Sequence, residues 1–134
     1  MLYFAYGSNL NHFQMKRRCK DSFFLKKINL KNFKLTFRSK YRAADIEPKK
    51  NSLVPGGLFE ISKSDEKKLD IYEDFPILYK KIYFTYYNKK VMTYIMVKKT
   101  VFRYPTERYL NIIKKGYKDC GLDKSFLLKA LKNI

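Results

Sequence analysis

The N-terminus constrains the fold most, because it places a strand, a glycine turn and a helix start within the first residues. Leu2–Ala5 is an unbroken apolar and aromatic run, which is typical of a buried strand. Gly7 interrupts this extended pattern, and Ser8 and Asn9 can each cap a helix that begins near Asn11. We therefore predict a buried strand that turns sharply into a helix.

The turn itself, Tyr6 to Leu10, has two interpretations. Where a strand ends in a glycine turn and a helix begins, several backbone N–H groups converge without partners, and the helix dipole adds to them. Such a place binds an anion. A plain connection between a strand and a helix explains the same five residues, so both interpretations stay open on local sequence.

Length and composition indicate one domain over residues 1–134. The chain is 46% hydrophobic and 17% aromatic, with 12 Tyr and 11 Phe, so it can bury a bulky, β-rich core. No apolar run approaches the roughly 20 residues of a membrane span. No basic and apolar leader precedes the first strand. We expect a cytoplasmic protein with no membrane partner.

The sulfur and imidazole side chains are too few for a recognisable metal site. Cys19 and Cys120 lie far apart, and His12 is the only histidine. A pair of Cys19 and His12 is two helical turns apart, too distant for direct proton transfer. We expect free thiols, no metal and no cofactor.

The net charge of +18 raises nucleic acid as a partner. However, 24 of the 30 basic residues are Lys, and they are dispersed along the whole chain, often as doublets. Base readout favours Arg, and single-strand binding needs a defined aromatic platform. We interpret the lysines as a solubilising surface, which leaves a nucleic-acid-binding protein as the least favoured alternative.

Hydrophobic periodicity predicts several short strands. Alternation of apolar and polar residues is clearest in Phe33–Phe37, and the clearest hairpin joins two runs across Asn88-Lys89-Lys90. Arg38 to Arg42 is expected to be a basic loop. The strand segments are Leu2–Ala5, Phe23–Ile28, Phe33–Phe37, Ala43–Pro48, Leu53–Ile61, Tyr79–Tyr87 and Val91–Val97.

Four helices are predicted from capping residues and stops. The first runs from Asn11 to Cys19 and exposes Lys16, Arg17 and Arg18. Ser64 caps the second, which ends close to Glu73 because Pro76 follows. The others are capped by Thr106, with Gly121 as the stop, and by Asp123. Short connections favour an α+β fold whose mostly antiparallel sheet, of about six strands, curls into a small barrel with flanking helices.

Glu73 is the best candidate for a catalytic carboxylate. Only 12 residues are acidic, and Glu73 lies at a helix end among aromatic residues. A partly apolar pocket disfavours the charged form and raises the pKa toward that of a general base. A carboxylate that simply faces solvent at the helix end is the alternative. No nucleophile elbow, Walker loop or dinucleotide fingerprint is present.

Taken together, the motifs resemble the gamma-glutamylcyclotransferase-like family over nearly the whole chain. The family comprises small cytosolic proteins with a six-stranded antiparallel barrel and flanking helices. The resemblance rests, in this order, on Tyr6-Gly7-Ser8-Asn9-Leu10, on Gln14 through Arg18-Cys19, on Leu69-Asp70-Ile71-Tyr72-Glu73, and on the Pro105 to Tyr109 segment.

The resemblance implies an acyl transfer within one small γ-glutamyl molecule. The α-amine would attack its own γ-carbonyl, giving 5-oxoproline and a released amine or amino acid, without a cofactor. Glu73 would be the general acid and base. The substrate would be bound by Tyr6, Gly7, Ser8, Asn9 and Leu10, whose amides would hold the α-carboxylate, and by Tyr79 and Tyr109 in the pocket wall.

One position departs from the family, which often has Gly after the glutamate, where this chain has Asp74. This second carboxylate could raise the pKa of Glu73 further or turn away from it. A binding module that holds a small carboxylate without chemistry is an alternative function on the same fold. The sequence indicates neither the identity of the amine nor the oligomeric state.

Overall fold

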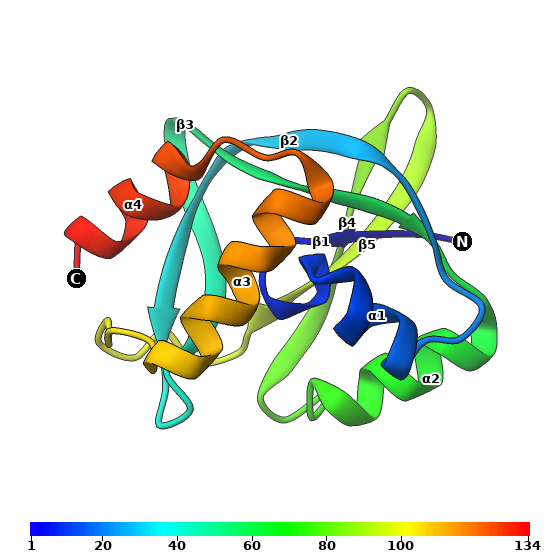
Figure 1. The fold of residues 1–134 in the computed structure, drawn as a ribbon, viewed down its shortest axis with the longest axis horizontal. Helices are drawn as coiled ribbons and strands as arrows, with labels where there is room; N and C mark the ends of the chain where they lie inside the picture. Colours follow the sequence, from blue (N-terminus) through cyan, green and yellow to red (C-terminus); the bar gives the residue numbers. More distant parts are fainter.

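The computed structural model describes all residues from Met1 to Ile134 (Figure 1). Five strands form one open sheet in the order β2-β3-β1-β5-β4. The strands are β1 (Leu2–Ala5), β2 (Phe23–Arg38), β3 (Ala43–Glu60), β4 (Tyr79–Tyr86) and β5 (Lys89–Met96). The helices are the 3₁₀ helix η1 (Ser8–Leu10), α1 (His12–Arg18), α2 (Lys63–Tyr72), α3 (Glu107–Cys120) and α4 (Lys124–Lys132).

The predicted α+β class is confirmed, but the predicted antiparallel barrel of about six strands is wrong. The sheet is mixed, because β1 pairs antiparallel with β3 and parallel with β5. The short β1 is its central strand, and its residues from Tyr3 to Ala5 are buried. Local sequence patterns reveal hairpins, but they do not reveal that the first strand lies parallel to the last.

The count of strands differs because four predicted segments are halves of two long strands. β2 contains Phe23–Ile28 and Phe33–Phe37, while β3 contains Ala43–Pro48 and all of Leu53–Ile61 except Ile61, which follows the strand. The two strands pair along almost their whole length, with register shifts at Phe24/Lys26 and Lys31/Phe33. Asn32 and Asn51 have left-handed backbones with φ of 64° and 66°. The polar residues that resemble loops are therefore irregular positions inside one bent hairpin.

The helix ends agree with the sequence with two exceptions. Thr106 caps α3, Gly121 ends it with a left-handed φ of 70°, and Asp123 caps α4. The prediction of Ser64 as the cap of α2 is wrong, because Ser62 accepts from the amide of Asp65 in a capping box. The prediction of Ser8 or Asn9 as the cap of α1 is also wrong, because Asn11 takes that role.

The turn after β1 is fixed by close packing against α3. Figure 1 shows α3 passing in front of the end of β1, with α1 beside it. Gly116 of α3 lies so close to η1 that a Cβ there would be 2.6 Å from the Asn11 amide nitrogen and from Leu10 Cβ. Leu10 is itself completely buried in the core. The backbone of the glycine turn is thus held between the central strand and α3.

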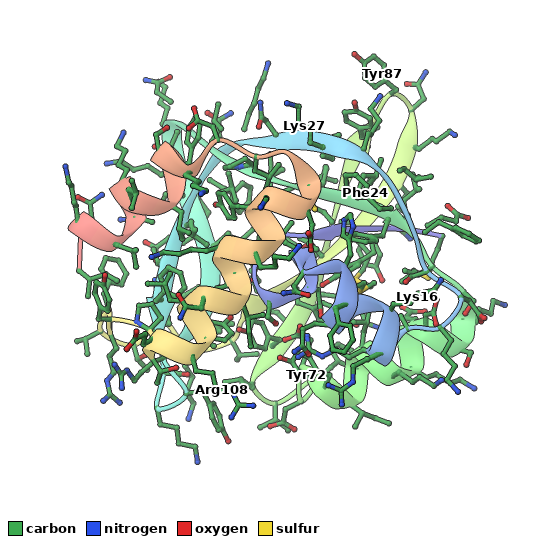
Figure 2. The ribbon with its side chains drawn as sticks, in the orientation of Figure 1. Lys16, Phe24, Lys27, Tyr72, Tyr87 and Arg108 are labelled. Carbon is green, nitrogen blue, oxygen red and sulfur yellow. The ribbon has the colours of Figure 1, made fainter.

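The charged surface is dispersed, as the sequence predicts. Figure 2 shows nitrogen-ended side chains on every side of the molecule, including Lys16, Lys27 and Arg108. Arg38, which we predicted at the start of a basic loop, is instead the last residue of β2 and is buried. None of the four helices combines the length and the apolar character that a membrane crossing requires.

Candidate active site

A cavity of about 500 Å³ opens where the glycine turn, the end of α2 and the start of α3 meet the sheet. Seven of the eight site residues predicted from sequence line it: Tyr6, Gly7, Ser8, Asn9, Glu73, Tyr79 and Tyr109. The eighth, Leu10, does not line the cavity and lies in the core beneath the turn. Residues from four separate parts of the sequence therefore face one space.

The end of α2 places Glu73 at this cavity. Glu73 is the C-cap residue, and the chain leaves the helix through a Schellman motif. The amide of Phe75 donates to the carbonyl of Asp70 at 2.9 Å, and the amide of Asp74 donates to that of Ile71 at 3.1 Å. Asp74 takes the left-handed conformation this motif requires, with φ of 51°. Glycine meets the same requirement at no steric cost, and Asp is among the few other residues that tolerate it.

Glu73 is a carboxylate without a protein partner. Its side chain is partly exposed toward the cavity and accepts no hydrogen bond from another protein group. Removal of water by the surrounding protein raises its pKa from 4.5 to about 7, and the positive charge of Arg18 acts in the opposite direction. Asp74 is exposed at the rim and has no part in this shift. Glu73 can therefore gain and lose a proton near neutral pH.

The glycine turn presents backbone donors to the same cavity. The amides of Leu10 and Asn11 are used within the turn, donating to the carbonyls of Gly7 and Ser8 at 3.1 Å each. The amide of Gly7 donates to no backbone carbonyl. The amides of Ser8 and Asn9 open the 3₁₀ helix and so have no partner within it. Amides that start a helix next to a cavity suit an anionic group.

Tyr79 and Tyr109 hold the backbone of one residue of β3, Ala44, between them. The Tyr79 hydroxyl donates to the Ala44 carbonyl at 2.6 Å, and the Tyr109 hydroxyl accepts from the Ala44 amide at 3.1 Å. Burial raises the pKa of both hydroxyls, so both are neutral in the physiological range. The Tyr109 hydrogen is therefore free to donate into the cavity, while that of Tyr79 is already committed.

Arg18 is the residue that sequence reasoning missed. We predicted it on the exposed side of α1, but the end of α1 directs it to the site. Its Nη1 donates to Ser8 Oγ at 3.1 Å and to Asn9 Oδ1. Its guanidinium carbon lies 3.5 Å from the centre of the Tyr72 ring, and Figure 2 places Tyr72 where α1 and α2 come together. An arginine adjacent to Cys19 in the segment that resembles the family is the only sequence signal that points to it.

The two cysteines are free and buried. Cys120, rather than Cys19, lies next to the histidine, with Sγ 3.5 Å from His12 Nε2. Burial raises the pKa of the Cys120 thiol to about 12, so it is not a nucleophile at neutral pH. No three His, Cys, Asp or Glu side chains gather in a way that could hold a metal ion.

Comparison with known proteins identifies a family that matches most of the chain. Residues 3–117 match the family described as gamma-glutamyl cyclotransferase, AIG2-like. The chain belongs to this family. No curated protein matches the chain in sequence.

Solved structures resemble the chain along its length. The crystal structure of an uncharacterized human protein, loc79017, is 30% identical with a TM-score of 0.80, covering 99% of this chain and 86% of its own. A structure described as gamma-glutamyl cyclotransferase is 27% identical with a TM-score of 0.79, covering 100% and 87%. YkqA from Bacillus subtilis shares the fold at 20% identity and a TM-score of 0.78, covering 100% of this chain and 55% of its own.

Proposed function

We propose that this protein is a gamma-glutamylcyclotransferase that cyclises the γ-glutamyl group of a small amine or amino acid conjugate to 5-oxoproline. The observation that carries the proposal is Glu73, a carboxylate with no hydrogen-bonding partner and a pKa of about 7, which shares a cavity with the free amides of the glycine turn. Membership of the family supports the same reaction class.

The α-carboxylate of the glutamyl group would bind at the turn formed by Tyr6, Gly7, Ser8 and Asn9. The amides there supply partial positive charge, and the absence of a side chain on Gly7 keeps the approach open. A Cβ on Gly7 would lie 3.1 Å from Ala44 Cβ and 3.4 Å from the Tyr109 hydroxyl. The Tyr109 hydroxyl would donate its free hydrogen to a substrate oxygen.

Glu73 would then move protons through the reaction one at a time. It removes a proton from the α-ammonium group, and the resulting amine attacks the γ-carbonyl carbon to form the ring C–N bond. It returns this proton to the nitrogen of the leaving amine as the original C–N bond breaks, and the second proton that the attacking nitrogen loses leaves with the amine, which is released as an ammonium ion. Because the amine and the carbonyl belong to one molecule, the site has only to hold a folded conformer.

The test is a screen of γ-glutamyl amines and γ-glutamyl amino acids with the purified protein, with 5-oxoproline measured by mass spectrometry. Glu73→Gln should lower its formation by roughly 10²–10⁴-fold, the range expected for loss of a general acid and base. Glu60→Gln is the matched control, since Glu60 is half-exposed beside the N-terminal ammonium group and outside the cavity.

The proposal is contradicted if no compound of a broad panel yields 5-oxoproline above the Glu73→Gln background. Thermal stabilisation by L-glutamate that persists in Glu73→Gln would then favour a binding module for small carboxylates.

A further inference from the structure

We propose that Arg18 is a positioning residue that joins the substrate-binding turn to the segment bearing Glu73 and supplies the positive charge of the site. This inference rests on the proposed function for its kinetic consequences. Its structural basis is independent of turnover, because it depends on contacts within the protein.

Arg18 contacts two parts of the site at once. Arg18 is the last residue of α1, and its Nη1 donates to two side chains of the turn, to Ser8 Oγ at 3.1 Å and to Asn9 Oδ1. Its guanidinium group stacks on the ring of Tyr72, 3.5 Å from the ring centre. The Tyr72 hydroxyl in turn lies 3.2 Å from Ser8 Oγ. Three elements, α1, η1 and α2, thus meet at one guanidinium group.

Tyr72 precedes Glu73, so this stacking acts directly on the end of α2. The turn is also held from its other side, because Asn9 Nδ2 donates to the Tyr3 hydroxyl at 3.0 Å. Loss of Arg18 would free both the Ser8 and the Asn9 side chains from α1. The amides expected to hold the α-carboxylate would then lose their fixed direction relative to Glu73.

The charge of Arg18 matters because the cavity has no cation in its wall. Although the chain carries 30 Lys and Arg residues, none lines the cavity, whereas Glu73 and Asp74 both do. A glutamyl substrate would add a third carboxylate. Arg18 is the cation that acts on Glu73 from behind the turn. Without it, the substrate carboxylate would be repelled with only partial charges to offset the repulsion.

The other titratable groups near Glu73 do not replace Arg18. Burial raises the pKa of five tyrosine hydroxyls there, which are therefore neutral near pH 7: Tyr3, Tyr6, Tyr79, Tyr94 and Tyr109. Asp70 is already paired with Lys81 and accepts a hydrogen bond from Tyr94. The groups that surround Glu73 are Tyr3 of β1, Tyr6, Tyr72 and Asp70 of α2, Asp74, Tyr79 of β4, Tyr94 of β5, Tyr109 of α3 and Arg18 of α1.

Arginine suits this position better than lysine would. The planar guanidinium group offers several donors in a fixed arrangement and can stack on an aromatic face at the same time. A lysine ammonium group could keep the charge but could not both stack on Tyr72 and bond the turn in this geometry. The charge and the geometry of Arg18 can therefore be separated by substitution.

The test compares Arg18→Met and Arg18→Lys with Arg17→Met. Arg17 is the matched control, because it is the adjacent arginine, is exposed and stacks on Phe13 away from the cavity. The Glu73 carboxyl is titrated by ¹³C NMR in each protein, and KM and kcat are measured for the substrate found in the screen. Arg18→Met should raise the midpoint of the Glu73 titration by about one pH unit, because the variant lacks the nearby positive charge that favours the ionised carboxylate.

Arg18→Met should also raise KM by about tenfold or more, the effect of losing an oriented charge-assisted interaction, while kcat above the midpoint changes less. Arg18→Lys should leave the midpoint near that of the wild type and still raise KM.

A purely structural role would lower thermal stability without moving the midpoint. Arg18→Met with the midpoint and the KM of Arg17→Met would overturn the inference. If no γ-glutamyl compound is cyclised, the proposed function fails, but the role of Arg18 can still be tested. The midpoint of the Glu73 titration is then compared among the variants as before, and thermal stabilisation by L-glutamate replaces KM as the measure of binding.

Discussion

Asp45 and Glu73 are two carboxylates near the same cavity with opposite surroundings. Asp45 is fully buried and fully paired: its carboxylate lies 3.2 Å from Arg38 Nε and 2.8 Å from Lys99 Nζ, and accepts from the Met96 amide at 2.8 Å. Glu73 is less buried, yet no protein group donates a hydrogen bond to it, and its pKa is raised to about 7. Burial alone therefore does not distinguish a structural carboxylate from a reactive one.

The difference lies in whether the charge is already satisfied. Asp45 joins the end of β2 to the end of β5, and Arg38 also pairs with Glu47. Its neighbour Ala44 lines the cavity, so this ion-pair cluster supports the wall of the site from behind. Glu73 faces the open side of that wall with its oxygens free. The first carboxylate holds the fold, and the second is available for proton transfer.

The largest effect on stability is expected from Asp45→Asn. Arg38 is only 2% exposed, so removing the Asp45 charge takes an ion-pair partner from a buried guanidinium group. Breaking a buried ion pair in this way typically costs roughly 3–5 kcal/mol. We expect a loss of about 3 kcal/mol in the free energy of unfolding, measured by urea denaturation. Glu60→Gln, at an exposed pair, should cost less than about 1 kcal/mol. Equal losses in the two variants would contradict the structural role assigned to the Asp45 ion pairs.

A smaller effect of opposite sign is expected from Glu73→Gln. The folded protein raises the pKa of Glu73 from 4.5 to about 7, so it binds the proton more tightly than the unfolded chain does. The stability this group contributes is therefore present below pH 4.5 and is lost as the pH rises to about 7. The wild type should lose stability relative to Glu73→Gln over this window, and the difference should be constant above it. Urea denaturation of both proteins from about pH 4 to pH 9 measures this. A constant difference throughout would mean that the pKa of Glu73 is not raised.

Much of the fold follows from local sequence because local chemistry determines it. The β4–β5 hairpin, the caps at Thr106 and Asp123 and the glycine stop at Gly121 agree with the structure for this reason. The long β2–β3 hairpin does not, because Asn32 and Asn51 have turn-like backbones inside a continuous strand pair. The parallel pairing of β1 with β5 joins segments about ninety residues apart, and no local pattern encodes it.

The candidate site was predictable where it depends on a motif and not where it depends on packing. The glycine turn and Glu73 were found from sequence, and the structure brings them to one cavity. Leu10 belongs to the same motif but faces the core, because α3 packs against the turn at that point. Arg18 was missed because its role depends on Ser8, Asn9 and Tyr72 meeting across three elements.

The most direct test of the account is the pH dependence of kcat/KM for 5-oxoproline formation by the wild-type protein. If Glu73 is the general base, kcat/KM should fall about tenfold per pH unit below a midpoint near 7, the pKa of this group in the free enzyme. Glu73→Gln should have no such acid limb and only residual activity. Wild-type activity that is unchanged well below pH 7, or a Glu73→Gln variant that turns over like the wild type, would contradict the central role of Glu73.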